Sequence, residues 1–483
     1  MPSLSNSFMA GETASISAQE YELLSIDYAQ GESDMNFVFF FHLPRHKTSL
    51  TIKRLTDSLF KTMIQFPVLL GRITAPKESS GGGKWKVVFD PDDPNWPDVS
   101  EASANRVTLA SIKRTDYAWR RWPRASRVPN LCQRAGNPLF GLHIVRYACG
   151  GISLHTKVRH QVMDGCGIWQ FYRAWASMCY ALSRRPQRKL MAARGDSEVL
   201  MHSRSSVLSA IGTVEGSVDQ GGMLDELDRF FERVALHRQS SAHAEVPRHM
   251  PARMHRFGIT YQALHRLKQR HGTMSACSPG HAQLFTTPHK ITYVSTNDLL
   301  CALFWRAISR AHQAVNPSDP NTCMMLACDV RHRIGLPPTY SGNLSFPLIM
   351  HSTKDELDGQ KLTDTATCIR HRINGITAGF VHESLALLAS EQLMQKLISL
   401  FDPANCFFSA SITSGFRMFD MSDFGFGQPA HIDIPAYLDP GFSIFMPTRS
   451  SKTAVNVCIS LRNDVFKHMA ADSEFTEFVD MIH

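Results

Sequence analysis

The sequence predicts a mixed α/β protein built from two domains. The chain has 483 residues, more than one hydrophobic core usually supports. Segments with the period of strands alternate with segments of helical period, which is typical of mixed α/β structure. This patterning weakens after about residue 185 and recovers after Pro288. We therefore expect an amino-terminal domain at 1–200, a crossover linker with some helix at 201–289, and a carboxyl-terminal domain at 290–483.

Four segments have the apolar periodicity of helices. Leu55–Phe66 carries apolar residues at helical spacing and stops before Pro67, which cannot continue a helix. Within the crossover, Leu224–Leu236 and Gln262–His271 show shorter patterns of the same kind. Thr296–Ala311 has a continuous apolar face and begins at polar residues suited to capping. We expect this last helix to open the ordered part of the second domain.

The composition is that of an ordinary globular protein, with 43% hydrophobic and 19% charged residues. No apolar stretch approaches the roughly 20 residues of a membrane helix, and Met1–Tyr21 lacks the features of a signal peptide. The 11 cysteines are scattered without Cys-x-x-Cys spacing. The sequence therefore predicts a cytoplasmic protein with reduced thiols, no membrane span and no metal site.

The formal net charge of +8 is compatible with an anionic partner. The basic run from Lys113 to Arg127 includes three aromatic residues, but no nucleic-acid-binding module accompanies it. We expect no nucleic-acid partner. A polyanionic co-substrate explains the positive charge better than nucleic acid does.

The strongest candidate for chemistry is His160. Apolar residues alternate with polar ones from Ile152 onward, which predicts a strand that points His160 inward at its far end. Asp164-Gly165 then turns the chain into a helix. A side chain at such a strand-to-helix connection is well placed to meet a substrate.

The chemistry of His160 suits a general base. Imidazole has an ordinary pKa of about 6.5, so it can accept a proton at neutral pH. Asp164 can fix the geometry of the site, and Gly165 permits backbone conformations closed to other residues. The alternative is a purely structural histidine, one of 22 in the chain. A second motif, Asp423-Phe424-Gly425-Phe426-Gly427, favours the catalytic interpretation.

With both motifs the chain resembles the BAHD acyltransferases, which carry His-x-x-x-Asp-Gly in mid-chain and Asp-Phe-Gly-Trp-Gly near the carboxyl end. The second motif, with Phe426 in place of tryptophan, is closer to fungal members. The resemblance extends along most of the chain, through Leu24-Ser25-Ile26-Asp27, the helix from Leu55 with the Gly71-Arg72-Ile73 that follows it, Thr296–Trp305, Asp329–Arg333 and Tyr340-Ser341-Gly342-Asn343.

The resemblance implies two similar chloramphenicol-acetyltransferase-like domains with mixed sheets, joined by the crossover, with the active-site channel at their interface. Acyl-CoA enters as a co-substrate, and no cofactor is permanently bound. His160 deprotonates the acceptor, which attacks the thioester directly. Asp164 pairs with Arg331, and Asn343 and Gly165 give structural support. Asp423 joins His160 and Asp164 as a catalytic-site residue, and with Gly425 and Gly427 it shapes the CoA-side wall rather than transferring protons.

One departure from the family pattern concerns the oxyanion. Members of the family often carry Thr-Ser-Trp or Ser-Ser-Trp upstream of the second motif, whereas this chain has Thr413-Ser414-Gly415. Thr413 or Ser414 is left to stabilise the developing negative charge. The missing indole also enlarges the predicted acceptor pocket.

The expected function is transfer of an acyl group, with acetyl preferred, to a hydroxyl of a secondary metabolite, by a monomer. The alternatives are N-acylation of an amine, a condensation-type enzyme that uses a carrier-protein thioester, and a non-catalytic relative that only binds ligands. Condensation enzymes prefer two adjacent histidines, and here Arg159 precedes His160. A serine hydrolase is excluded because no Gly-x-Ser-x-Gly elbow occurs.

Overall fold

The computed structural model falls into two compact units. Unit 1 comprises Met1–Gly212, Gly335–Leu344 and Arg417–Pro435, and unit 2 comprises Thr213–Ile334, Ser345–Phe416 and Ala436–His483. Most of the predicted crossover, including Leu224–Leu236, lies outside the described part of the chain. The structure describes residues 16–24, 26–27, 30, 33–75, 85–126, 138–183, 207, 232, 252–272, 293–388, 396, 399, 405–435 and 438–481.

Unit 1 contains a five-stranded mixed sheet in the order β12-β2-β7-β6-β5 and a small sheet in the order β1-β4-β3. Strands β5 and β6 are parallel, and the other pairs of the larger sheet are antiparallel. The elements are β1 (Gln19–Glu22), β2 (Asp34–Phe41), η1 (Arg45–Lys47), α3 (Thr48–Met63), η2 (Pro67–Leu70), β3 (Arg72–Thr74), β4 (Lys86–Phe89), β5 (Asp98–Ala104), α4 (Leu109–Lys113), η3 (Trp119–Arg121), η4 (Arg124–Ser126), β6 (Phe140–Tyr147), β7 (Ile152–Arg159), α5 (Gly165–Ala181), α15 (Met418–Met421) and β12 (His431–Asp433).

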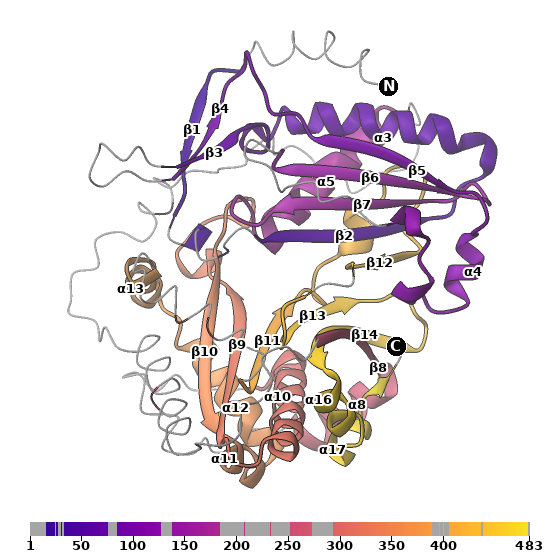
Figure 1. Ribbon diagram of the computed structural model, residues 1–483. Coiled ribbons are helices and arrows are strands. Elements are labelled where there is room, and N and C mark those ends of the chain that lie inside the picture. Colours follow the sequence, from indigo (N-terminus) through magenta and orange to yellow (C-terminus); the bar gives the residue numbers. More distant parts are fainter. Residues whose placement is uncertain are drawn as a thin grey trace. The chain divides into compact units, whose positions relative to one another are not determined.

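Helices α3 and α5 lie behind the larger sheet of unit 1 in Figure 1. Phe37 and Phe39 project from β2 to this side, and each makes edge-to-face contacts with Trp169 and Tyr172 of α5. Such aromatic pairs add stability beyond the area they bury. The predicted helix at 55–66 corresponds to the end of α3, which begins a further two turns upstream. The core therefore holds α5, and with it the turn after β7, in a fixed position.

The segment with the second motif belongs to unit 1, although we expected it in the carboxyl-terminal domain. Strand β12 pairs antiparallel with β2, with His431 opposite Phe40. Phe424 is fully buried against Trp175 of α5, with ring centroids 4.7 Å apart. Strand pairing and aromatic packing between residues almost 400 positions apart group this segment with the first half of the chain, which local patterns cannot reveal.

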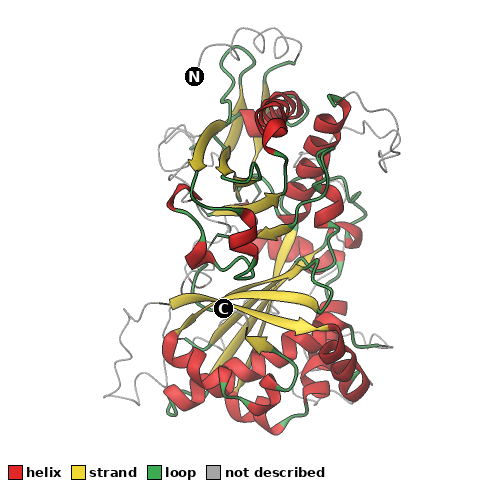
Figure 2. Ribbon diagram, turned by 90° about the vertical axis from the view of Figure 1, so that its right-hand side faces the viewer, coloured by secondary structure: helices red, strands yellow, loops and turns green. Residues whose placement is uncertain are grey.

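Unit 2 is built on a seven-stranded mixed sheet in the order β10-β9-β11-β13-β14-β8-β15. The parallel pairs are β9–β11 and β11–β13. Figure 2 shows its helices gathered on one side of the sheet. The elements are β8 (Ala252–Thr260), α8 (Tyr261–His271), α10 (Thr296–Val315), β9 (Asn321–Asp329), η5 (Arg331–Arg333), β10 (Ser345–Thr353), α11 (Lys354–Gly359), α12 (Leu362–Asn374), α13 (Ala378–Leu388), β11 (Phe407–Ile412), β13 (Phe442–Pro447), β14 (Thr453–Arg462), α16 (Asn463–Ala470), α17 (Ser473–Thr476) and β15 (Asp480–Met481).

Strand β8 lies inside this sheet, between β14 and β15, where we expected linker. The sequence of β8 does not look like that of a buried strand, because two of its buried residues are polar. His255 is 9% exposed and Arg256 is 1% exposed. The helix predicted at Gln262–His271 is confirmed as α8. The mixed α/β class is confirmed in both units, and β8 begins before residue 290, where we expected the carboxyl-terminal domain to start.

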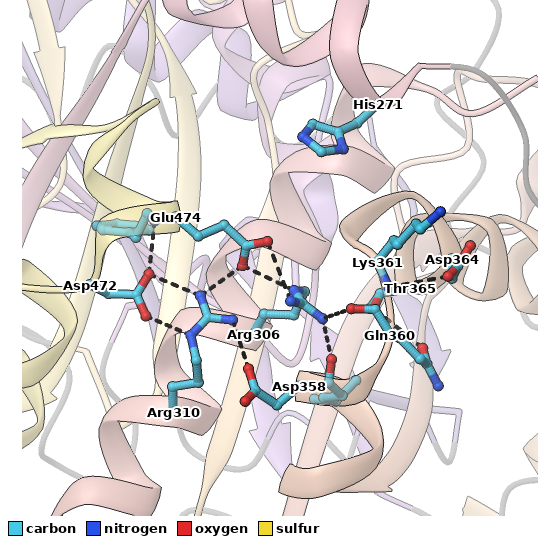
Figure 3. A network of polar contacts seen from close by, with 12 residues as sticks. His271, Arg306, Arg310, Asp358, Gln360, Lys361, Asp364, Thr365, Asp472 and Glu474 are labelled. Atoms are coloured by element: carbon cyan, nitrogen blue, oxygen red, sulfur yellow. Dashed lines mark hydrogen bonds and ion pairs between the residues drawn. The ribbon is translucent and has the colours of Figure 1, made fainter.

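The helix predicted at Thr296 is confirmed as α10, with Ser295 as its N-cap in a capping box with Asp298. A polar network ties the helix to its neighbours (Figure 3). Arg310 donates to Asp472 and Glu474, at 2.6 and 2.7 Å. Arg306 donates to the Glu474 carboxylate and to carbonyls at the end of α11. Guanidinium groups with several partners, one buried (Arg306) and one partly buried (Arg310), hold the helical layer of unit 2 together.

Two buried histidines make stability depend on pH. Burial lowers the pKa of His155 and of His312 to about 3, whereas in the unfolded chain the value is about 6.5. Below pH 6.5 the unfolded chain therefore takes up protons that the folded chain refuses. We expect the free energy of unfolding to be constant above pH 7 and to fall between pH 6.5 and 3, by about 1 kcal/mol per pH unit for each histidine.

Urea unfolding at pH 7, 6 and 5 measures this loss, provided that the transition is reversible. The matched variants His155→Asn and His312→Gln should each reduce the slope. An unchanged slope in both variants would mean that other groups cause the pH dependence.

Candidate active site

His160 occupies the first position after β7, as predicted. Its backbone N–H donates to the Ser33 carbonyl at 3.0 Å, which ties it to the residue before β2. The chain then turns, with the Val162 N–H donating to the Arg159 carbonyl at 3.2 Å, and α5 begins at Gly165. The side chain is partly buried. The strand end and the helix start thus fix the backbone on both sides of this histidine.

The surroundings of His160 favour its neutral form. Burial lowers the pKa of His160, while its own carbonyl, Asp164, Asn343 and Asp34 act in the opposite direction. The net shift is downward, so the ring is uncharged at pH 7 and can accept a proton. Its Nδ1 atom is buried and makes no hydrogen bond within the described residues.

Asp164 is the N-cap of α5 and is almost fully buried, at 1% exposure. Its Oδ1 accepts from the Gly167 N–H at 3.0 Å, and its Oδ2 accepts from the Leu344 N–H at 2.8 Å. The carboxylate therefore joins the start of α5 to the segment at 340–344. Arg331, in unit 2, is buried and pairs with Asp329 at 2.9 Å. The predicted pairing of Arg331 with Asp164 stays a prediction.

Asn343 contacts the backbone of His160. Its Nδ2 donates to the His160 carbonyl and to Asp27 Oδ1, both at 2.8 Å. Asn343 was predicted as a supporting residue, whereas Asp27 was not predicted to be part of the site. The only signal for Asp27 was its place in the Leu24-Ser25-Ile26-Asp27 motif, because 316 residues separate it from its partner.

A glycine is required at position 167 rather than at 165. A Cβ atom on Gly167 would lie 2.0 Å from the Ser341 carbonyl oxygen, which is far inside contact distance. Gly165 is the first residue of α5 and needs no left-handed conformation. The conformational role that we predicted for Gly165 is therefore wrong. The close approach at Gly167 brings the segment that carries Asn343 against α5.

Two cations and one carboxylate lie next to His160. Asp34 faces Arg159 in the β2–β7 register, and its carboxylate is 2.7 Å from Lys157 Nζ and 3.6 Å from Arg159 Nε. All three side chains are at most 14% exposed. Of these three groups Asp34 acts on His160, because its negative charge raises the pKa of the ring. These residues were not predicted, because Asp34 and Lys157 look like ordinary polar strand positions.

The second motif forms a loop anchored by Asp423. Asp423 Oδ1 accepts from the N–H groups of Gly425 and Gly427, at 3.0 and 3.2 Å. Both glycines have positive φ, +84° and +109°, which favours glycine. The side chain of Phe426, which replaces the family tryptophan, lies under the Arg54 guanidinium, 5.7 Å from the ring centroid. This geometry gives Asp423 an architectural task, and its predicted catalytic role stays a prediction.

Thr413 and Ser414 follow β11 in unit 2. The Thr413 hydroxyl donates to the Phe445 carbonyl at 2.8 Å, and the side chain is buried. A hydroxyl has one proton, so Thr413 has none left for an oxyanion in this arrangement. Ser414 is partly exposed in the turn that follows. The predicted oxyanion donor therefore falls to Ser414, and this stays a prediction.

Two features are absent from the residues that the structure describes. None of the helices there combines the length and the apolar character needed to cross a bilayer. The same residues contain no group of three or more His, Cys, Asp or Glu side chains arranged to hold a metal ion.

Known proteins resemble this chain along most of its length. The family model "Transferase family" matches residues 13–476. A trichothecene 3-O-acetyltransferase from Saccharomyces cerevisiae is 26% identical over 195 residues, which are 39% of this chain and 41% of that protein. A hydroxycinnamoyl-CoA:5-hydroxyanthranilate N-hydroxycinnamoyltransferase from Avena sativa is 24% identical over 69% of this chain and 68% of its own length.

Among solved structures, TRI101 of F. sporotrichioides complexed with coenzyme A and T-2 is similar in fold. The TM-score is 0.71 at 20% identity, over 96% of this chain and all of that one.

Proposed function

This chain belongs to the Transferase family, the BAHD acyltransferases, and we propose that it moves an acyl group from acyl-CoA to a hydroxyl of a small-molecule acceptor. The observation that carries the proposal is the setting of His160, whose backbone is held at the end of β7 by Ser33 and Asn343 and whose pKa is lowered by burial. Acetyl is the preferred acyl group, because two of the relatives are trichothecene 3-O-acetyltransferases.

The proposed reaction has two proton transfers. His160 Nε2 takes the proton of the acceptor hydroxyl while the oxygen attacks the thioester carbonyl carbon, and the ring becomes imidazolium. The tetrahedral intermediate collapses, the C–S bond breaks, and the CoA thiolate takes the proton from His160. Asp164 and Asp34 stabilise the transient positive charge, since both raise the pKa of His160. No covalent bond to the protein forms.

A hydroxyl acceptor of a secondary metabolite is favoured by the trichothecene enzymes, which act on such molecules. One observation favours a second candidate, an amine acceptor. The Avena sativa relative is an N-hydroxycinnamoyltransferase and covers more of this chain than the yeast O-acetyltransferase does. The same base serves both reactions, so the acceptor pocket decides between them.

A donor and acceptor screen tests this function. Acetyl-, malonyl-, benzoyl- and coumaroyl-CoA are combined with trichothecene alcohols, phenols and aromatic amines, and release of free CoA thiol is followed. We expect acceptor-dependent thiol release with at least one alcohol and acetyl-CoA. Transfer only to amines would establish the second candidate, and turnover that requires a carrier-protein thioester would refute free acyl-CoA as the donor.

The pH dependence of the reaction follows from the shift at His160. Because the pKa of His160 in the free protein lies below 6.5, the base is already active at pH 6.5. We expect kcat/KM to be flat between pH 7 and 8 and to fall on an acid limb whose midpoint lies below 6.5. Initial rates over pH 4.5–8, with the acceptor and acyl-CoA well below their KM values, measure it. A midpoint above 7 would contradict a buried, neutral base.

A further inference from the structure

We propose that Asp27 and Asn343 are positioning residues that hold His160 in the tautomer with its proton on Nδ1, which leaves the Nε2 lone pair for the substrate. This inference rests on the proposed function of His160 as the base. It gives a task to the Leu24-Ser25-Ile26-Asp27 motif, which the proposed reaction does not otherwise use. All three residues lie in unit 1.

The amide of Asn343 can have only one orientation. Its Nδ2 lies 2.8 Å from Asp27 Oδ1 and 2.8 Å from the His160 carbonyl oxygen. Both of these atoms are acceptors without a proton, so only the NH₂ group satisfies them. The reversed amide would place three oxygen atoms together. The carboxylate of Asp27 therefore determines which end of Asn343 points away from it.

The other end of this amide is the acceptor that the imidazole lacks. Asn343 Oδ1 is buried without a hydrogen-bond partner, and so is His160 Nδ1, within the part of the chain that the structure describes. The Asn343 side chain raises the pKa of His160, which requires an oxygen facing the ring. Hydrogen bonds of catalytic groups are often long before substrate binds and tighten in the complex. A proton on Nδ1 satisfies both orphaned atoms at once.

The Asp27 carboxylate is held in place, so it can determine the orientation of the Asn343 amide. Its carboxylate is 3% exposed, and its second oxygen accepts from the Leu24 N–H. A buried carboxylate with amide donors on both oxygens does not rotate freely. The contacts thus link Asp27 to Asn343 and Asn343 to His160. The Asp27 carboxylate determines the orientation of the Asn343 amide, and that amide determines the tautomer of the His160 ring.

Other charges around His160 do not select a tautomer. Asp164 is occupied by the N–H groups of Gly167 and Leu344. On the strand side, Asp34 pairs with Lys157 and lies 3.6 Å from Arg159. Asp164 and Asp34 raise the pKa of the ring through their charge, whereas Asn343 Oδ1 is the acceptor whose position can select a tautomer.

Asp27→Asn is the decisive change. The Leu24 N–H keeps an oxygen, so the new NH₂ faces Asn343 and forces its amide to turn. Asn343 then presents NH₂ to Nδ1, which stabilises the tautomer with the proton on Nε2. We expect kcat to fall about 100-fold, with the KM for acyl-CoA changed less than about threefold. The acid limb of kcat/KM should also move to lower pH, because a donor now faces the ring.

The tautomer itself is read on the full-length protein without substrate, by ¹⁵N–¹H correlation of histidine-labelled protein, with the His160 signals identified by their loss in His160→Gln. We expect Nδ1–H in the native protein and Nε2–H in Asp27→Asn. The matched control is Asp319→Asn in unit 2, where Asp319 Oδ1 likewise holds an asparagine amide, that of Asn321 at 3.1 Å. It should leave the tautomer and kcat unchanged.

The same tautomer in the native protein and in Asp27→Asn would overturn the proposal, whatever the activity. A slower variant whose acid limb stays in place would also overturn it, since a merely structural role predicts that result. If Asp27→Asn does not fold, Asn343→Ala is measured instead, and it should lower the Nδ1–H population. A failure of the proposed function itself would be seen separately, as full turnover by a variant that lacks His160.

Discussion

The variant His160→Ala is expected to lower kcat by about 10²- to 10⁴-fold, which is the usual contribution of a general base. Alanine removes the only imidazole placed at the end of β7, while Asp164 and Asn343 keep their contacts with the backbone of the turn. The fold should therefore survive. The measurement is thiol release from acyl-CoA with the acceptor found in the screen, over a range of acceptor concentrations.

Two controls separate chemistry from folding. The melting temperature and the affinity for the acyl-CoA donor should stay close to those of the native protein. His46→Ala, at an exposed position on η1, should leave kcat unchanged. Full turnover by His160→Ala would refute the role of His160 as base, and equal loss in both variants would show that the assay responds to something else.

The position of His160 was predictable from sequence, but its environment was not. The alternation from Ile152 and the Asp164-Gly165 turn place His160 correctly, since both are local signals. The buried side chains that tune its pKa come from elsewhere in the chain. Asp34 and Asn343 reach it through β2–β7 pairing and through a contact across 183 residues. No periodicity in a single segment encodes such contacts.

The fold shows the same division between local and distant signals. Helices with an apolar face, such as α10, were predicted with their caps, because cap and periodicity lie within a few residues. Strand β8 was missed, since buried His255 and Arg256 give it a polar sequence. The placement of the Asp423 loop in unit 1 depends on the pairing of β12 with β2. Pairings of this kind are decided by tertiary contacts.

A second large effect is expected at Gly167, where any side chain collides with backbone. A Cβ atom there would lie 2.0 Å from the Ser341 carbonyl oxygen and 3.3 Å from Met163 Cβ. The carbonyl cannot move alone, because the following residues hold Asp164 through the Leu344 N–H and His160 through Asn343. We expect Gly167→Ala to destabilise the protein by about 3 kcal/mol, the upper end of the usual cost of overpacking.

Displacement of the 340–344 segment should also slow the reaction, because it separates Asn343 from the His160 carbonyl. We expect the stability loss in urea unfolding and, under conditions where the variant is folded, a lower kcat with the base still present. Gly359→Ala is the matched control, since that glycine also lies at a helix end but has no atom within 4 Å of the added Cβ. It should be close to neutral. Equal stability of both variants would mean that the 340–344 segment can move at little cost in free energy. Such a segment could not hold His160 in place.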